Sequence, residues 1–171
     1  DILTGRLSGI AAHHVPNYLI KNRVPTYRTN CIEDWESKVD SIVDETLSEN
    51  MTLISGIPPW VQMYFEKLKE KTGKHIKDIF PNFDLFIYGG VNYHPYKRVF
   101  EKLIGKQIDG IETYAASEGF IAYQDSQEKE GMLLCVNHGV FYEFISVDEF
   151  FNKTASRIYL ADVEVDVNYV V

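Results

Sequence analysis

The stretch that decides the fold, residues 85–119, reads LFIYGGVNYHPYKRVFEKLIGKQIDGIETYAASEG. Residues 85–88 form an apolar run that stops at two glycines, which is typical of a buried strand. Residues 96–104 carry apolar side chains at helical spacing, and Gly105 follows where a glycine commonly ends a helix. Residues 108–114 predict a second strand. A strand, a helix and a strand in this order predict a parallel pair joined by a crossover helix. The helix is predicted to point these side chains inward: Tyr96, Val99, Phe100 and Leu103.

The preceding part of the chain shows the same rhythm. Residues 33–47 have the pattern of an amphipathic helix, residues 51–55 that of a short strand, and residues 60–71 that of a helix closed by Thr72-Gly73. Residues 4–25 are rich in glycine and proline breakers, and the pattern indicates one short helix there, near Leu7–His13. Together with the deciding stretch, these segments predict a parallel βαβαβ core.

The pattern changes after this core. Residues 132–136 and 140–146 flank Asn137-His138-Gly139, which predicts an antiparallel hairpin. Residues 157–171 alternate apolar and polar side chains over much of their length, which predicts one long half-buried strand. The fold class expected is therefore α/β, with a parallel βαβαβ core and an antiparallel hairpin and strand extension.

Composition limits the classes of function. The chain has 171 residues, 45% hydrophobic and 25% charged, which suits one globular domain. A formal net charge of −8 argues against a nucleic-acid partner, because a phosphate backbone needs a basic face. No apolar run reaches the roughly 20 residues that span a bilayer. Without such a run, no membrane partner is expected. Cys31 and Cys135 lack metal-ligand spacing and are expected to be reduced core thiols, which favours a cytoplasmic protein.

Two predicted loops carry the candidate chemistry. Gly89-Gly90 and Ala115–Glu118 each follow a strand of the same predicted sheet, and ligands of open parallel sheets lie at the carboxyl ends of the strands. Glycine permits close approach to a flat ligand, and a carboxylate suits a magnesium ion that holds phosphates. The pattern alone leaves a second interpretation open, in which the glycines form only a tight turn and Glu118 is a solvated acid.

Three other residues have two interpretations each. Trp35 and Trp60 lie on predicted helices, where tryptophan is more often a core anchor than a stacking surface for a ligand. Glu143 lies between aromatic residues on a predicted strand, so it is either a buried, paired acid or a site residue.

The sequence around these loops resembles a known family. Residues 113–120, TYAASEGF, resemble the adenine- and magnesium-binding signature of the auxin-conjugating acyl-acid amido synthetases, within the firefly luciferase-like superfamily of acyl-adenylate-forming enzymes. The family form is Tyr-Ala-Ser-Ser-Glu, and Ala116 stands here in place of its first serine. Gly89-Gly90-Val91 resembles the adenine-binding turn of the family, and residues 139–145 resemble its Tyr-Phe-Glu-Phe-Ile segment.

The resemblance implies a two-step ligase reaction with ATP and Mg²⁺ as cofactors. A carboxylic acid is activated as an acyl-adenylate with loss of pyrophosphate, and an amine, usually of an amino acid, then takes the acyl group. Two alternatives stay open: transfer to coenzyme A, and a non-catalytic module that keeps a nucleotide-shaped pocket. The implied nucleotide-binding residues are Gly89, Gly90, Val91, Tyr114, Ala115 and Ala116. The implied catalytic residues are Ser117 and Glu118, with Glu118 as the magnesium ligand, and the implied acyl pocket comprises Thr113, Ala115 and Phe120.

The resemblance also implies that residues 1–171 are a single-domain fragment, the central part of the large adenylate-forming domain. The phosphate loop of the family is expected upstream of Asp1. Its ribose-binding aspartate and its carboxyl-terminal domain are expected after Val171. The segment by itself is therefore expected to be inactive.

Overall fold

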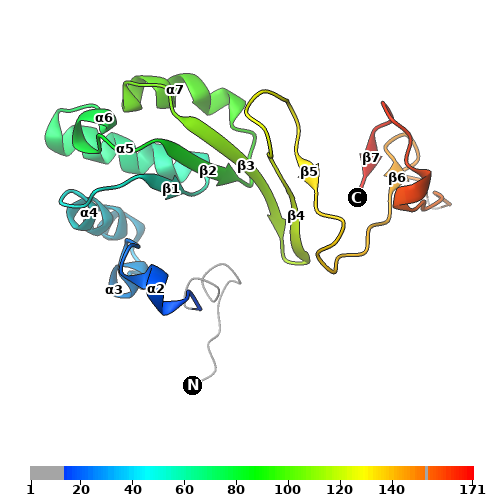
Figure 1. The fold of residues 1–171 in the computed structure, drawn as a ribbon, viewed down its shortest axis with the longest axis horizontal. Coiled ribbons are helices and arrows are strands. Elements are labelled where there is room, and N and C mark those ends of the chain that lie inside the picture. Colours follow the sequence, from blue (N-terminus) through cyan, green and yellow to red (C-terminus); the bar gives the residue numbers. More distant parts are fainter. Residues whose placement is uncertain (1–13, 153) are drawn as a thin grey trace.

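The computed structural model describes residues 14–152 and 154–171, and its central feature is a five-stranded mixed sheet flanked by helices (Figure 1). The strand order is β1-β2-β3-β4-β5, with the first three strands parallel and the last two antiparallel to their neighbours. The helix predicted near Leu7–His13 lies outside the described residues.

The parallel half of the sheet confirms the predicted βαβαβ core. Each crossover between parallel strands contains at least one helix, and from residue 14 onward two short helices and α4 precede the first strand. The elements of this half are α2 (Asn17–Ile20), α3 (Tyr27–Asn30), α4 (Trp35–Thr46), β1 (Leu53–Ser55), α5 (Pro58–Thr72), α6 (Ile76–Ile79), β2 (Leu85–Gly89), α7 (His94–Ile104) and β3 (Asp109–Ala116).

Local chemistry sets the ends of the three long helices. The Asp34 carboxylate accepts a hydrogen bond from the Ser37 backbone N–H at 2.8 Å, which caps the start of α4. Helices α5 and α7 end at Gly73 and Gly105, with φ angles of 70° and 78°. Glycine adopts this left-handed conformation without the steric cost of a side chain, so both helices end where the sequence predicts.

The main core lies between the sheet and helices α4, α5 and α7. Phe65 on α5 is fully buried, and its ring lies 5.8 Å from that of Phe83 and 5.6 Å from that of Phe100, measured between ring centroids. Thr46 and Tyr64 share a buried hydrogen bond of 2.6 Å between α4 and α5. Burial raises the pKa of Tyr64 to about 12, so the hydroxyl stays protonated in this contact.

The antiparallel half of the sheet differs from the prediction. Strand β3 extends through Ala116, turns at Ser117-Glu118, and returns as β4 (Gly119–Tyr123). Strand β4 then pairs with β5 (Leu133–Leu134). The predicted hairpin between residues 132–136 and 140–146 is therefore wrong, because β4 takes the place of the second arm as the partner of β5.

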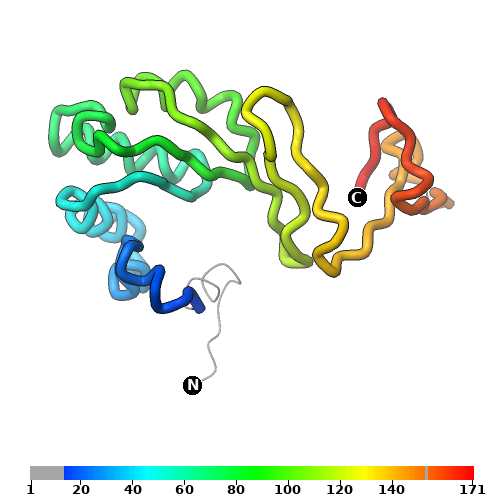
Figure 2. Tube along the Cα trace, in the orientation of Figure 1, coloured from blue at the N-terminus to red at the C-terminus, as the bar shows by residue number. Residues whose placement is uncertain are grey.

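The C-terminal part forms a separate two-stranded sheet, β6 (Ile145–Ser146) with β7 (Tyr169–Val170). Figure 2 shows the chain leaving β5 and reaching this small sheet at the far end of the molecule. The single long strand predicted over residues 157–171 is wrong. A 3-10 turn at Leu160–Asp162 and a positive φ of 64° at Asp166 interrupt the extended chain.

Three predictions of burial also fail. Cys31 is exposed, whereas Cys135 is buried, and both are free thiols. Trp60 and Val99 are 46% and 36% exposed. Each lies on the helix predicted for it, but at the border of the apolar stripe rather than in its centre. Among the described residues, no helix has the length and apolar character needed to cross a membrane.

We predict that Phe65→Ala lowers the free energy of unfolding by about 3–5 kcal/mol, because it removes the buried ring that joins α5 to α7 and leaves a cavity. Urea denaturation followed by circular dichroism measures the change. Phe151→Ala is the matched control, since Phe151 is 91% exposed. Its effect should stay within about 0.5 kcal/mol. Equal effects of the two changes would refute the assignment of the core.

Candidate functional site

The carboxyl ends of the three parallel strands meet at one edge of the sheet. At this edge, β1 is followed by Gly56-Ile57 and β2 is followed by Gly90-Val91. Strand β3 continues past the edge, because its residues beyond Thr113 no longer pair with β2. This edge is where parallel sheets bind ligands. The predicted glycine turn lies at this edge, whereas the predicted Ser-Glu motif lies beyond it, at the far end of β3.

Gly89 and Thr113 are in direct contact across β2 and β3. They are register partners, and the Thr113 hydroxyl donates a hydrogen bond of 3.0 Å to the carbonyl oxygen of Tyr88. A Cβ atom added at Gly89 would overlap the carbonyl oxygen of Thr113 and lie 3.0 Å from its Oγ1. The absence of a side chain at Gly89 thus allows the two strands to approach at this point.

Gly90 forms the turn that follows. Its φ of 80° lies in the left-handed region, which favours glycine. A Cβ atom at Gly90 would lie 3.9 Å from the Ile57 side chain, so the turn packs beside the loop that follows β1. Val91 is 39% exposed. Residues 56–59 were not assigned to the site from the sequence, although Gly56 directly after a strand was an available signal.

The three residues of the implied acyl pocket share one face of the β3–β4 hairpin. Thr113 and Ala115 are two residues apart on β3, and Phe120 is the register partner of Ala115. Tyr123 pairs with Thr113 on the same face, and its ring centroid lies 6.2 Å from that of Phe120. These side chains form a continuous strip along the hairpin.

Tyr114 and Ala116 belong to the opposite face, because side chains alternate along a strand. The side chain of Tyr114, which is implied in nucleotide binding, is therefore separated from the implied acyl pocket by the thickness of β3. The register shifts between Tyr114 and Ala115, which leaves one extra residue in β4 and bends the hairpin at this point.

Ser117 and Glu118 form the exposed tip of the hairpin. Ser117 lies four residues beyond Thr113, or about 13 Å along an extended strand. The structure thus brings Gly89 together with Thr113, while the two implied catalytic residues lie at some distance along the same element. In the described part of the chain, neither the Ser117 hydroxyl nor the Glu118 carboxylate has a hydrogen bond or an ion pair.

The donor set limits the kind of magnesium site that the tip could form. Among residues 14–152 and 154–171, no three His, Cys, Asp or Glu side chains gather in a way that could hold a metal ion. Magnesium is often held by one or two carboxylates with water and the phosphates of a substrate. Glu118 fits this kind of site and does not fit a cage made of protein ligands alone.

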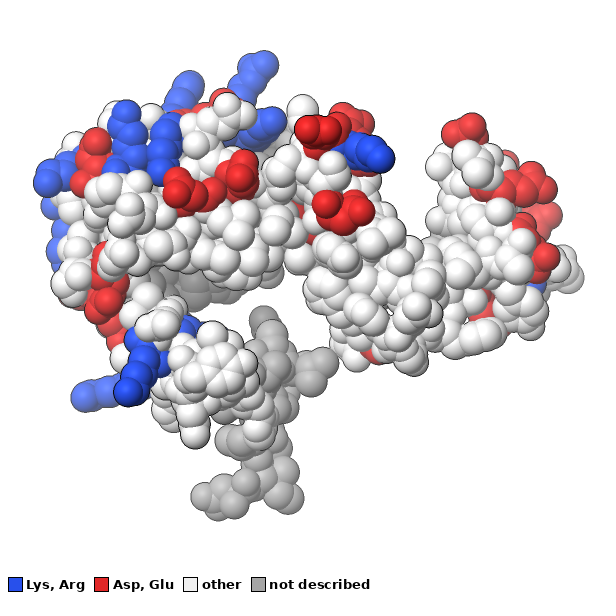
Figure 3. Space-filling model, in the orientation of Figure 1, with Lys and Arg blue, Asp and Glu red and all other residues white. Residues whose placement is uncertain are grey.

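The hairpin is an open surface rather than a closed pocket. Tyr114 and Phe120 are 47% and 42% exposed. Figure 3 shows few charged side chains over the outer part of β3 and β4, whereas Lys and Arg gather over α5, α6 and α7. A surface of this kind suits one apolar wall of a binding site, with a second wall supplied by another element.

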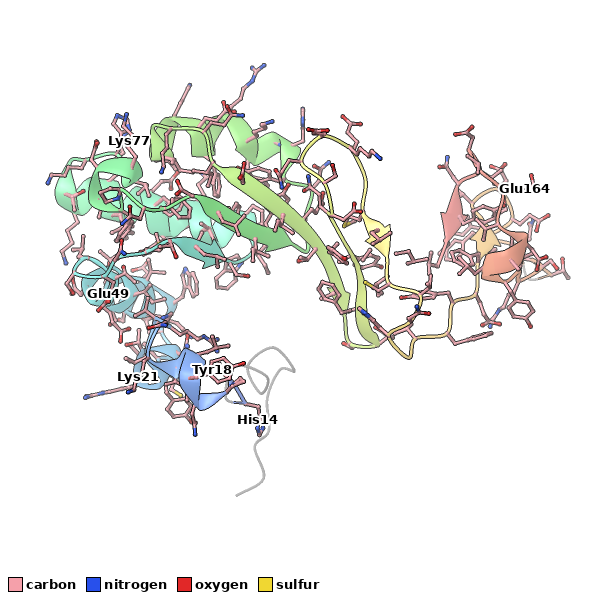
Figure 4. All side chains as sticks on the ribbon, in the orientation of Figure 1. His14, Tyr18, Lys21, Glu49, Lys77 and Glu164 are labelled. Atoms are coloured by element: carbon pink, nitrogen blue, oxygen red, sulfur yellow. The ribbon has the colours of Figure 1, made fainter. Side chains whose placement is uncertain are left out.

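A larger cavity lies elsewhere, at the free edge of β1. Its volume is about 990 Å³, and its lining includes Trp35, Trp60 and residues of β1. The two tryptophan rings meet edge to face with centroids 3.9 Å apart. Figure 4 labels Lys21 and Glu49, which line this cavity from the segments after α2 and α4.

Glu143 forms an ion pair with Arg157, at 2.8 Å between Oε2 and Nη1. The pair joins the segment before β6 to the segment before the 3-10 turn. Of the two interpretations of Glu143, the structure favours the paired acid, although its side chain is 39% exposed rather than buried.

The comparisons with known proteins add no assignment. No protein-family model matches the chain, and the comparison with curated proteins gives no significant match.

We predict that Thr113→Val lowers the free energy of unfolding by about 0.5–1.5 kcal/mol, because it removes the hydrogen bond to the Tyr88 carbonyl and keeps the side-chain shape. Thr113→Ser is the matched control and should retain the hydroxyl contact. Amide hydrogen exchange at Gly89 and Gly90 is the local measurement, and it should quicken in the valine variant alone. If exchange at both glycines were unchanged in Thr113→Val, this hydrogen bond would not hold the turn.

Proposed function

We propose that this chain carries one wall of an acyl-adenylate site, in an enzyme that activates a carboxylic acid with ATP and transfers the acyl group to an amine. The observation that carries the proposal is the direct contact of Gly89 with Thr113. It joins the two stretches of sequence that resemble the adenine-binding turn and the adenylate motif of acyl-acid amido synthetases. We propose the luciferase-like large domain as the fold of the whole, in a cytoplasmic protein whose free thiols fit a reducing compartment.

The nucleotide would lie along the hairpin. Because Gly89 and Gly90 have no side chains, a flat base can approach their backbone closely. The half-exposed ring of Tyr114 offers a stacking surface, which is worth about 1–3 kcal/mol for a base on an aromatic side chain. The hairpin tip lies about 13 Å beyond Thr113. This spacing suits an extended nucleotide, with its base recognised near Gly89 and its phosphates recognised at the tip.

At the tip, the Ser117 hydroxyl would donate a hydrogen bond to the α-phosphate, and the Glu118 carboxylate would hold the magnesium ion. Bound magnesium neutralises charge that develops on the phosphate oxygens. A substrate carboxylate oxygen attacks the α-phosphorus and pyrophosphate leaves. The amine nitrogen then attacks the acyl carbon and AMP leaves. Since the protein mainly positions these groups, a rigid hairpin is a suitable platform.

The acyl tail would lie on the face that carries Thr113, Ala115 and Phe120. These side chains are apolar except for one hydroxyl, which is already bonded to Tyr88. Tyr123 extends the same face. The arrangement favours acids with an apolar tail, aliphatic or aromatic.

We predict that Glu118→Gln in the full-length protein lowers the rate of acyl-adenylate formation by on the order of 100-fold, the scale expected when one charge-stabilising group is lost. The required Mg²⁺ concentration should rise, because a neutral amide is a poorer ligand for this ion. Acid-dependent exchange of pyrophosphate into ATP measures both effects. Glu128→Gln removes an exposed acid outside the hairpin tip and should leave the exchange unchanged. A Glu118→Gln variant with the wild-type rate and Mg²⁺ dependence would show that Glu118 is a solvated acid.

We predict that Phe120→Ala changes acid selectivity rather than the rate of chemistry. Removing the ring enlarges the proposed pocket, so bulkier acids should gain relative to small ones by roughly 10–200-fold in kcat/KM. The measurement is kcat/KM over a series of acids of increasing chain length. Phe141→Ala, which removes an exposed ring outside the hairpin, is the control. An equal loss across the whole series would assign Phe120 to structure instead.

A further inference from the structure

A second cavity lies between α7 and the sheet, on the face that the helices cover. Its volume is about 440 Å³, within the range of pockets that take small molecules. Its walls come from β2, β3, α7 and the segment after β4, and they include Tyr88, Tyr93, Glu101 and Glu112. None of the residues implied in nucleotide or acyl binding lines it.

Two tyrosine rings form part of the wall. The ring centroids of Tyr88 and Tyr93 are 4.4 Å apart with an interplanar angle of 34°, and both rings pack against Phe86. Burial raises the pKa of Tyr93 to about 12 and raises the pKa of Tyr88 in the same direction. Both side chains are therefore neutral, and the faces of neutral phenol rings attract cations.

Carboxylates line the same cavity as the two rings. Glu112 on β3 is the register partner of Tyr88, and its charge helps to raise the pKa of that tyrosine. Glu101 lies eight residues after Tyr93, two helical turns along the same side of α7, and acts on Tyr93 in the same way. Asp109 also lines the cavity.

The lining carries excess negative charge. Within residues 14–152 and 154–171, the carboxylates of Glu101, Asp109 and Glu112 have no ion pair. Of the two lining lysines, Lys106 is paired with Asp84, so Lys97 remains, with His94 also in the lining, against three acids. Among these described residues, no three His, Cys, Asp or Glu side chains gather in a way that could hold a metal ion.

We propose that this cavity binds a small organic cation, with its ammonium group against Tyr88 and Tyr93 and beside Glu112. The cavity, the ring pair and the unpaired acids point to the same ligand chemistry, because a cation gains from both aromatic faces and carboxylates. None of the residues of the proposed adenylate site lines this cavity, although Tyr88 and Glu112 directly precede Gly89 and Thr113 in the chain. The cation site does not depend on the adenylation proposal.

The test uses choline as the probe and 3,3-dimethylbutan-1-ol as its neutral analogue of the same shape. Isothermal titration calorimetry measures the affinity of each probe for the chain. NMR chemical shifts of the tyrosine rings report whether the probe binds beside them. Choline should bind at least tenfold more tightly than the neutral analogue and should shift the ring signals of Tyr88 and Tyr93. Absence of saturable choline binding, or equal binding of both probes, would overturn the proposal.

Variants test the contributions of the Glu112 carboxylate and of the Tyr93 ring to choline binding separately. Glu112→Gln and Tyr93→Leu should each weaken choline binding by about tenfold, whereas Tyr93→Phe should retain most of it because the ring remains. Glu149→Gln, the same loss of charge outside the cavity, should have no effect. Circular dichroism verifies that each variant is folded. If Glu112→Gln and Glu149→Gln bound choline equally well, the lining charge would not be a recognition element.

Discussion

The close approach of β2 and β3 at Gly89 and Thr113 is the constraint on which the candidate site depends. A side chain at Gly89 would overlap the Thr113 backbone, and the Thr113 hydroxyl holds the Tyr88 carbonyl at 3.0 Å. Because β3 is fixed there, its outer half can project beyond β2 as one arm of a hairpin. The Phe65 core behind the strands supplies the rigidity, and the hairpin supplies the exposed groups.

The parallel half of the fold could be predicted because its signals are local. Helical spacing, proline in the first turn and glycine at the end define α5 and α7 within their own residues. The position of Gly89 at the carboxyl edge of the sheet then follows from the parallel order alone. The prediction that Trp60 and Val99 are buried was wrong, because the neighbouring element, rather than the helix itself, determines where the apolar stripe of a helix ends.

The antiparallel half could not be predicted in the same way. The Ser117-Glu118 turn lacks the Asn-Gly or Asp-Gly signal typical of two-residue hairpins, so the return strand β4 was missed. The strand β6 pairs with β7, whose residues lie more than twenty positions later in the chain. Such pairings are decided by which strand is free to pair, and alternation in a single segment such as residues 157–171 carries no information about its partner.

The central claim is that the Gly89-Gly90 turn and the 113–120 hairpin form one wall of an acyl-adenylate site. A crystal structure of the full-length protein with a non-hydrolysable acyl-sulfamoyl adenosine tests it most directly. We expect the adenine beside Gly89, Gly90 and Tyr114, the sulfamoyl group near Ser117, and the acyl tail on the Phe120 face. An analogue bound away from this hairpin, or the absence of saturable binding, would refute the claim.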